Sequence, residues 1–465
     1  MTLRVEAPST FGPERRYVYS VLLEEFLGLD VVYEVREGDG TRIVHDRKSL
    51  FVADGLFKTS AQAWLKPESL PREPLCSWGA GRSFLKPRLM MKDVPVLYGR
   101  DPESPSFLVI RPGSVELGLD VFGSCFFLLT RYEEIVERAR DAHNRFGAQQ
   151  SVLGRAGLVE RAIVNEYLEV LWAGLRLLWP SLKRTPREFR VLLSHDVDRP
   201  FEHAFADLWR LGRAFGGDLV RRRSPRAAAR RVYDWARVKM GHAEADPFYN
   251  FGRIMSLAER NGLRSAFYFL ADRTVPNRDG DYELSHAWIR GLLREIHARG
   301  HEIGLHGSYE TYRDSDRVKR ELRLLQDVCA REGISQSDWG GRQHYLRWEA
   351  PVTWRAYEAA GLKYDSSLAF ADAAGFRCGV CYEFSPYDVS LRRQLAVRER
   401  PLIAMERTII DSAYMGLGWG DKASAKLAQL KETCRFWQGD FTLLWHNSEL
   451  VSERAWVMLE DVVAG

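Results

Sequence analysis

From residue 189 onward, short apolar runs alternate with amphipathic segments that end in glycine. The runs RSAFYFL, HEIGLH and KYDSSLAF each follow such a segment. In SHAWIRGLLREIHARG, Trp288, Leu292 and Ile296 recur at helical spacing, Ser285 is the expected N-cap, and Gly300 suits the left-handed position past the helix end. Repeated strand–helix units predict a parallel sheet covered by helices, either open or closed into a barrel. In such sheets the chemistry gathers at the carboxyl ends of the strands.

The first 185 or so residues have a different pattern, which predicts a separate and smaller α/β unit. A helix is expected over PERRYVYSVLLEEFLGL, because a proline and a glycine bracket its apolar positions. DVVYEV and SFLVI are typical of strands, and residues 151–179 predict a closing helix or helix pair. The connector PSLKRTPREF, with two prolines, separates this unit (1–185) from a second domain (189–465).

Two insertions interrupt the second domain. The first, at about 207–240, is strongly basic; its core at 210–239 is either a solvated helical face or a contact for an anionic polymer, a nucleotide-linked sugar or a membrane surface. The second, at about 369–435, holds AYMGLGWG, a candidate sugar-stacking loop, and the pair Cys378 and Cys381. A zinc ribbon needs a second such pair, so we favour structural thiols over a site-lining or redox role.

Composition narrows the class of protein further. The chain has 465 residues, of which 45% are hydrophobic and 28% charged, as in soluble globular proteins, and its net charge of +4 does not indicate a nucleic-acid partner. No apolar run reaches the roughly 18 residues of a membrane span, and no long apolar segment opens the sequence. Six cysteines in so long a chain do not indicate a disulfide framework. We therefore expect a cytoplasmic protein without a signal peptide.

Ionisable side chains stand at the predicted strand ends, where burial is costly unless something neutralises them. Asp196 and Asp198 close the strand in LLSHDVDRP, and a later strand ends at His306, with Glu310 one helical turn beyond. The further members of this set are Arg342, His344, Asp365 and His446. For His301, at the entrance of its strand, a packing role is an equal alternative.

If these side chains converge, they form a site for zinc or a similar divalent ion, because Asp, His and Glu all bind such metals. Asp196 and Asp198 would point the same way on an extended segment, where their like charges repel. A metal ion bound to one carboxylate would offset this repulsion and leave the other carboxylate available as a base. A glycosidase with paired carboxylates is disfavoured, since these two lie too close to flank a scissile bond.

The order of five motifs, SHDVD, RGHEIGLHGSYET, RQHY, YDSSL and LLWHN, resembles the NodB-homology polysaccharide deacetylases, carbohydrate esterase family 4. It is most similar to a divergent branch associated with bacterial surface-polysaccharide loci. The resemblance covers roughly residues 189–450 and implies a distorted, incomplete parallel β/α barrel. The N-terminal unit resembles an uncharacterised domain that often precedes this branch.

The resemblance also implies catalytic roles. Asp196 corresponds to the general base and Arg342 to the residue that orients it. Tyr345 would offer its backbone N–H to the oxyanion. His446 corresponds to the general acid, and Asp365 to the carboxylate that tunes this acid.

For the metal, the resemblance implies Asp198 and His306 as ligands. The second histidine of the family's second motif falls on Glu310, which is a departure; a glutamate can ligate zinc, but its charge would make bound water less acidic. His344 stands where the family has a proline, and is therefore an additional or replacement ligand.

These features predict a metal-dependent N-deacetylase acting on an N-acetylated sugar of a bacterial surface polysaccharide, or on its nucleotide- or lipid-linked precursor. The expected ion is Zn²⁺, with Co²⁺, Mn²⁺ or Ni²⁺ as alternatives. Two other functions stay open: a non-catalytic glycan-binding relative, because the second motif lacks a histidine, and a metal hydrolase of another amide, such as a formyl amide, or of a glycosidic bond. The sequence does not fix the oligomeric state.

Overall fold

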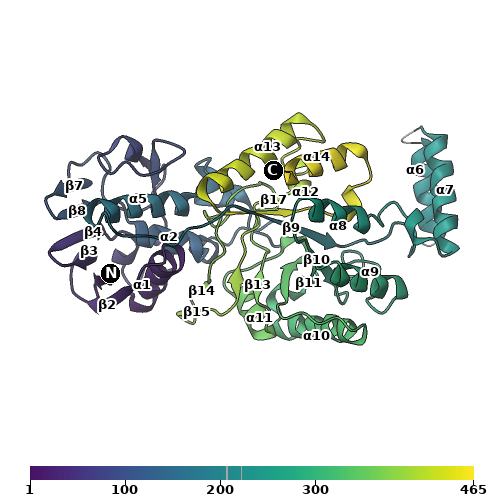
Figure 1. Cartoon of the computed structure of the whole chain (residues 1–465), viewed down its shortest axis with the longest axis horizontal. Coiled ribbons are helices and arrows are strands. Elements are labelled where there is room, and N and C mark those ends of the chain that lie inside the picture. The colour runs from purple at the N-terminus through teal and green to yellow at the C-terminus, as the bar shows by residue number, and fades with distance from the viewer. Residues whose placement is uncertain (206–207, 221–222, 465) are drawn as a thin grey trace.

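The structure is a computed structural model that describes residues 1–464 apart from 206–207 and 221–222. The second half of the chain forms a strongly curled sheet of eight parallel strands, an incomplete β/α barrel (Figure 1), in the order β16-β13-β12-β11-β10-β9-β18-β17. This confirms the predicted fold class. The strands are β9 Arg190–Val197, β10 Ala266–Leu270, β11 Glu302–Gly307, β12 Gly340–Gln343, β13 Tyr364–Asp365, β16 Arg398–Glu399, β17 Ala404–Met405 and β18 Asp440–Leu444.

Helices between and after these strands cover the outside of the sheet. They are α8 Phe251–Arg260, α9 Ala287–Ala298, α10 Ser315–Arg331, α11 Val352–Ala360, α12 Glu406–Ile410, α13 Asp421–Trp437 and α14 Glu453–Val463. Helix α9 buries Leu292 and Ile296 on its inner face, and each such side chain contributes roughly 1.5–3 kcal/mol relative to exposure. Gly300 has a φ of 78°, as predicted. The predicted N-cap Ser285 is wrong: the helix begins later, and His286 Nδ1 accepts the Trp288 N–H at 3.3 Å.

The N-terminal part is a smaller mixed α/β domain, also as predicted. Its sheet has the order β2-β1-β3-β4-β8-β7 and combines parallel and antiparallel pairs. The strands are β1 Leu3–Ala7, β2 Val31–Val35, β3 Gly40–His45, β4 Lys48–Ala53, β7 Leu108–Arg111 and β8 Ser114–Leu117. The helices include α1 Gly12–Tyr19, the π-helical Ser20–Phe26 that continues it, α2 Val121–Leu129, α3 Tyr132–Val136, α4 Val152–Arg155 and α5 Ile163–Leu178.

A buried charge cluster joins the two parts. Glu134 of α3 accepts from Arg377 Nη2 at 2.6 Å and from Arg131 Nε at 2.8 Å, and Arg131 Nη1 donates to the Arg377 carbonyl at 2.5 Å. All three side chains are buried. Removing one member would leave an unpaired buried charge, which typically costs about 3–5 kcal/mol.

The two insertions have contrasting structures. In the basic insertion, α6 Leu208–Val220 and α7 Pro225–Lys239 form a hairpin that projects from the barrel, at the right of Figure 1. The loop insertion packs inside the molecule, with Cys378 and Cys381 buried in the core. Burial raises the pKa of the Cys378 thiol, which favours its unreactive protonated form. No helix among the described residues is long and apolar enough to cross a bilayer.

Candidate functional site

The sequence-predicted polar residues meet at the carboxyl ends of neighbouring strands. Asp198 follows β9, His306 is the penultimate residue of β11, His344 follows β12, and His446 follows β18. With Asp196 they line a cavity of about 510 Å³. The strand order explains this convergence, because β12, β11, β10, β9 and β18 are consecutive in the sheet and all run the same way.

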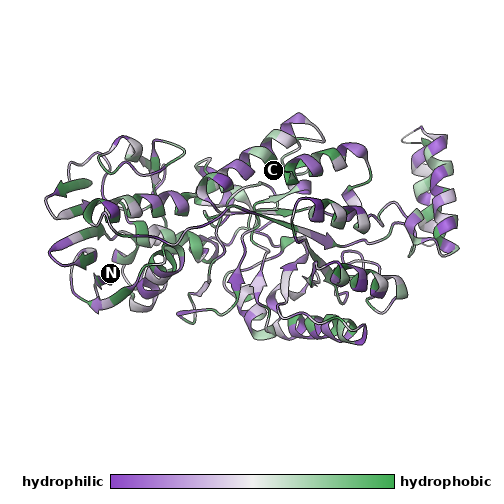
Figure 2. Ribbon diagram, in the orientation of Figure 1, coloured by the Kyte–Doolittle hydropathy of each residue, from purple (hydrophilic) through white to green (hydrophobic). Residues whose placement is uncertain are grey.

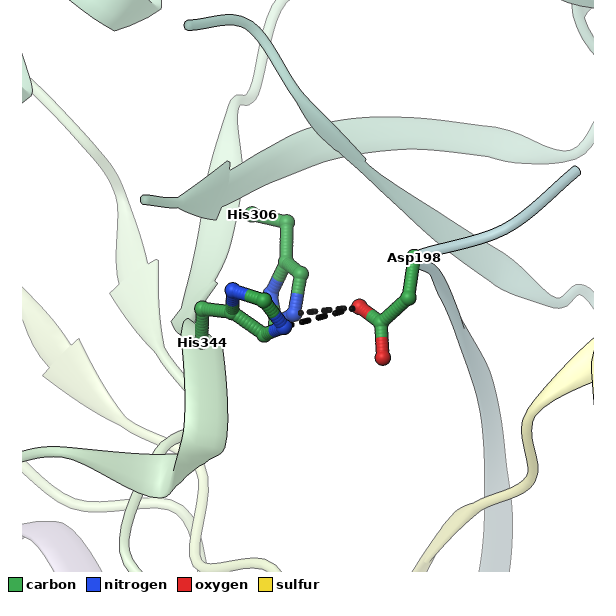
Figure 3. A group of neighbouring side chains, drawn as sticks. All are labelled: Asp198, His306 and His344. Atoms are coloured by element: carbon green, nitrogen blue, oxygen red, sulfur yellow. Dashed lines mark ion pairs between the residues drawn. The ribbon is translucent and has the colours of Figure 1, made fainter. Parts of the chain in front are cut away.

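Asp198, His306 and His344 form a compact group whose side chains point toward one another (Figure 3). Asp198 Oδ1 lies 3.1 Å from His306 Nε2 and 3.5 Å from His344 Nε2. Ligands held about 2.0–2.2 Å from a tetrahedral zinc ion are themselves about 3.3–3.6 Å apart. The two distances from Asp198 are therefore close to those between neighbouring ligands of one ion, and the ligand atoms of all three side chains lie within 4.8 Å of one another.

The hydrogen bonds of the two histidines orient their Nε2 atoms for binding a cation. His306 donates its Nδ1–H to the carbonyl oxygen of Arg342 at 2.9 Å, and His344 donates its Nδ1–H to Asp279 Oδ1 at 3.0 Å. Each ring in its neutral form therefore presents the lone pair of Nε2 to Asp198. A carboxylate or carbonyl behind a ligating histidine is the usual arrangement around protein metals.

The electrostatics of the group also favour a positive charge next to Asp198. Asp198 Oδ1 is shielded from solvent and has no hydrogen-bond partner among the described residues. Although burial opposes ionisation, His344 and His306 hold the pKa of Asp198 well below its usual value. Burial likewise lowers the pKa of His344, but Asp198 and Asp279 outweigh it and raise that pKa to about 9. Either a proton or a metal ion between the Asp198 carboxylate and the two Nε2 atoms would supply this positive charge. One carboxylate and two imidazoles are ligands that suit a divalent ion such as zinc.

Beside this group, Asp196 is held by a fully buried arginine. Arg342 Nη1 donates to Asp196 Oδ1 at 2.9 Å, while its other donors bond Ser366 and the hydroxyl of Ser194. The second Asp196 oxygen lies 3.7 Å from His306 Nε2. Because every nitrogen of the guanidinium is engaged, the Asp196 carboxylate has a fixed orientation at the wall of the cavity.

His446 lies on another side of the cavity, against a carboxylate that the sequence did not reveal. Its Nδ1 is 2.5 Å from Glu406 Oε1, and its Nε2 is 3.6 Å from Asp198 Oδ2. Burial lowers the pKa of His446, but the charge of Glu406 more than offsets this and raises it to about 9. The resemblance assigned the tuning carboxylate to Asp365. That side chain instead accepts from Trp348 Nε1 at 3.0 Å and from the Ser367 N–H at 2.9 Å.

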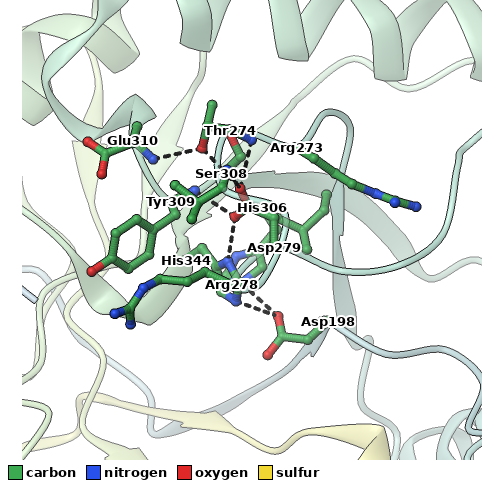
Figure 4. Close-up of polar contacts among 12 residues, drawn as sticks. Asp198, Arg273, Thr274, Arg278, Asp279, His306, Ser308, Tyr309, Glu310 and His344 are labelled. Atoms are coloured by element: carbon green, nitrogen blue, oxygen red, sulfur yellow. Dashed lines mark hydrogen bonds and ion pairs between the residues drawn. The ribbon is translucent and has the colours of Figure 1, made fainter. Parts of the chain in front are cut away.

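Glu310, an expected metal ligand, does not join the group. Its carboxylate points away from the two imidazoles (Figure 4) and pairs with Arg347 Nη1 at 3.1 Å. The assumption of helical spacing from His306 fails, because β11 continues to Gly307 and Glu310 lies in a turn before the short 3-10 helix Thr311–Arg313. His344, the alternative ligand in the sequence analysis, occupies the third position.

Tyr345, the expected oxyanion residue, lines the cavity with a strained backbone. Tyr345 and Leu346 have φ values of 61° and 54°, in the left-handed region that non-glycine residues rarely adopt. The N-terminal part stabilises this turn: Arg145 Nη1 donates to the Tyr345 carbonyl at 3.2 Å, while Arg145 Nε pairs with Asp141 Oδ2 at 2.8 Å. The His143 ring lies 4.9 Å from the Tyr345 ring.

Three exposed arginines, Arg199, Arg278 and Arg407, line the cavity along with the buried Arg145. Within the described part of the chain, Arg199 and Arg278 have no carboxylate at ion-pair distance, and Arg407 reaches Asp411 and Glu449 only at 3.7 and 3.8 Å. The rim therefore presents positive charge that the protein leaves largely uncompensated.

Three functional candidates were absent from the sequence prediction. Asp279 lies in the long loop after β10, where NRDGD gave only a turn signal; Glu406 follows a strand of two residues; and Arg145 comes from the N-terminal part. None of them stands at a strand end recognisable from its apolar pattern. Conversely, His301 has the packing role: its Nδ1 accepts the Ser265 N–H at 3.1 Å.

Comparison with known proteins does not identify an activity for this chain. Residues 3–180 match the model of a family described as a family of unknown function, DUF7033. No functionally curated protein matches the chain. Among solved structures, the chain is similar to a candidate polysaccharide deacetylase from Mycobacterium smegmatis, with 17% sequence identity, coverage of 60% of this chain and 84% of that chain, and a TM-score of 0.35.

Proposed function

We propose that this protein is a metal-dependent N-deacetylase, which hydrolyses the acetamido group of an N-acetylated sugar in a bacterial surface polysaccharide or its precursor. One observation carries the proposal. A cation-binding group, an oriented carboxylate and a histidine with a raised pKa meet in one cavity. These are the parts that hydrolysis of an unactivated amide requires.

Asp198, His306 and His344 would hold the ion. A divalent ion in this position supplies Lewis acidity, which polarises a carbonyl group and makes water more acidic. The chain's own contribution is to fix the ligands. Arg342 and Asp279 set the tautomers of the two histidines, so that both Nε2 atoms stay available for coordination.

Asp196 is the proposed base. Arg342 holds it through Oδ1, so its other oxygen is free to accept a proton from the attacking water. The Arg342 guanidinium is buried and bonded on all sides, and it therefore keeps Asp196 in place while the proton moves. General base catalysis of this kind contributes on the order of 10²–10⁴-fold.

His446 is the proposed acid. The Glu406 carboxylate keeps a proton on its Nδ1 and favours the imidazolium form, so that Nε2 carries the proton that passes to the departing sugar amine. The Tyr345 backbone N–H, presented by the left-handed turn that Arg145 supports, is the proposed donor to the oxyanion.

The arginine rim indicates the type of substrate. A neutral oligosaccharide would leave Arg199 and Arg278 without a counter-charge, whereas a carboxylate or phosphate next to the acetamido sugar would pair with their guanidinium groups. We therefore assign an anionic glycan or a phosphate-linked sugar as the substrate class.

The test is release of acetate by the zinc-loaded protein from N-acetylated glycan probes: neutral chitooligosaccharides, UDP-N-acetylglucosamine and an acidic N-acetylated polysaccharide. We expect acetate from at least one anionic probe, and Asp196→Asn and His446→Gln to reduce its rate on the order of 10²–10⁴-fold. Formate in place of acetate would indicate another amide hydrolase. If the protein binds a glycan without releasing any product, and Asp196→Asn leaves the glycan affinity unchanged, the proposal is contradicted and a non-catalytic binding protein is favoured.

A further inference from the structure

The helical hairpin α6–α7 stands apart from the catalytic cavity and has an unusual surface. Helix α6 packs along α7, and the pair projects from the barrel (Figure 1). Asp218 on the inner face of α6 pairs with Arg231 Nε of α7 at 2.6 Å, which holds the two helices together. Hydrophobic and hydrophilic residues are interspersed around both helices (Figure 2), so neither outer face is purely polar.

The outer face of α6 is apolar. Leu208, Trp209 and Val220 expose 70%, 68% and 78% of their surfaces, although such residues are normally buried. Successive residues are about 100° apart around a helix. Six residues of α6 therefore share an arc of about 120° on the side of the helix away from Asp218. That set is Leu208, Trp209, Gly212, Gly216, Leu219 and Val220. The two glycines add no side chain, so the large apolar groups at both ends of the helix stand clear.

The same hairpin concentrates the positive charge of the protein. Residues 208–240 contain ten arginines and lysines against two aspartates, and the whole chain has a net charge of only +4, so the remaining residues are net negative. One aspartate is Asp218, already paired with Arg231, and the other, Asp234, lies 3.5 Å from Arg230. Exposed Tyr233 on α7 and exposed Met240 just past its end lie among the basic residues.

We propose that the α6–α7 hairpin binds the surface of an anionic lipid bilayer. An apolar helix face bearing tryptophan, surrounded by arginines, is the composition of helices that lie in the membrane interface. The apolar face would enter the boundary between headgroups and acyl chains while the arginines contact lipid phosphates. With 13 residues, α6 is about 20 Å long, which suits a helix lying in the interface rather than crossing the bilayer.

Two other occupants fit less well. An anionic polymer such as a nucleic acid would pair with the arginines but would leave Leu208, Leu219 and Val220 exposed to water. A second copy of the chain could cover the apolar face, but it would bring two strongly positive hairpins together and their charges would repel. A lipid surface satisfies the apolar residues and the charge at once.

The position of the hairpin in the chain links it to the cavity. Helix α6 begins ten residues after Asp198, and the intervening segment includes Arg199 of the cavity rim and Glu202, which pairs with Arg231. Membrane binding would therefore anchor the chain close to the site. The lipid interaction itself does not depend on the proposed hydrolytic activity.

Co-sedimentation of the full-length protein with vesicles tests the proposal. We expect binding to vesicles that contain phosphatidylglycerol, and binding to pure phosphatidylcholine that is weaker by about tenfold or more. The reason is that each basic residue near an anionic surface contributes favourable binding free energy. The double variant Trp209→Ser/Val220→Ser should weaken the binding about tenfold or more through lost apolar burial. Arg226→Gln/Arg230→Gln should weaken it as well and reduce its sensitivity to salt.

Phe84→Ser is the matched control, since Phe84 is an exposed aromatic residue of the N-terminal part. It should bind like the wild type, and thermal melting should show that all variants are folded. Absence of binding to anionic vesicles by the wild type would overturn the proposal. So would binding that Trp209→Ser/Val220→Ser leaves unchanged while polyphosphate competes it away, which would indicate a polymer partner. A change in oligomeric state caused by Trp209→Ser/Val220→Ser, without any effect on vesicle binding, would overturn it in favour of self-association.

Discussion

The carboxylate of Glu406 lies 2.5 Å from Nδ1 of His446, in the buried wall of the cavity. The two residues follow the neighbouring strands β17 and β18, so the sheet itself brings them together. This contact decides the protonation state of the histidine. Burial alone would keep the ring neutral, and the carboxylate raises its pKa to about 9.

The first prediction concerns Glu406→Gln and the pH dependence of the reaction. In the wild type, activity that requires the imidazolium is present below the raised pKa and is lost as the pH rises through about 9. Without the carboxylate, the descending limb of the pH–rate profile should move toward the ordinary histidine value of about 6.5, and the rate at pH 8 should fall about 30-fold. Steady-state rates from pH 5 to 10 measure this shift.

Asp365→Asn separates the two candidate tuning carboxylates. Asp365 bonds Trp348 and Ser367, so its replacement should leave the descending limb in place even if the rate falls. A shift of this limb in Asp365→Asn, together with an unchanged limb in Glu406→Gln, would restore the role that the family resemblance implies.

Asp279→Asn should weaken metal binding. Asp279 accepts the Nδ1–H of His344. It also accepts the backbone N–H of Val275 in its own loop at 2.8 Å and that of Tyr309, after β11, at 2.7 Å. Loss of such a partner behind a ligating histidine typically reduces metal affinity 10–100-fold. Zinc titration against a competing chelator gives the value. Asp272→Asn, an exposed residue of the same loop, should bind zinc as the wild type does, and an equal affinity in all three proteins would exclude this role.

Arg145→Met tests the contribution of the N-terminal part. The variant loses the support of the Tyr345 turn, and we expect a fall in kcat on the order of 10–100-fold with unchanged metal content, because small displacements of reacting groups are costly. Arg138→Met is the control, being an exposed arginine of the same segment. If both variants retain wild-type kcat, the N-terminal part does not support the turn during catalysis.

Arg278→Gln tests the charge of the substrate. Arg278 is exposed at the rim and lies over the Tyr309 ring at 4.8 Å, without a carboxylate partner among the described residues. A lost charge-assisted hydrogen bond should raise KM for an anionic substrate roughly 10–100-fold and leave a neutral oligosaccharide unaffected. Arg273→Gln, an exposed neighbour in the loop, should change neither. Equal effects of Arg278→Gln on both substrates would contradict an anionic substrate.

The fold was predictable because its signals are local. Alternating apolar runs and glycine-ended amphipathic segments predicted a parallel sheet covered by helices, and the family resemblance narrowed this to an incomplete barrel. The strand ends then placed Asp196, Asp198, His306 and His446 at one rim. Residues outside this pattern were not predictable. Glu406 follows a strand too short to show an apolar period, and Asp279 and Arg145 reach the cavity through contacts between segments distant in sequence. Glu310 was expected beside the metal because it was taken to lie one helical turn after His306. The chain instead leaves β11 in a non-helical turn, and the Glu310 carboxylate pairs with Arg347.

The most direct test of the central claim is the metal content of the purified protein after zinc loading, measured by mass spectrometry on the wild type and on Asp198→Ala, His344→Ala and Glu310→Ala. The structure predicts about one ion per chain in the wild type and in Glu310→Ala, and loss of the ion in the other two. Among the residues that the structure describes, Asp198, His306 and His344 form the group that could hold an ion. An ion retained in His344→Ala and lost in Glu310→Ala, or no ion in the wild type, would contradict the proposed centre.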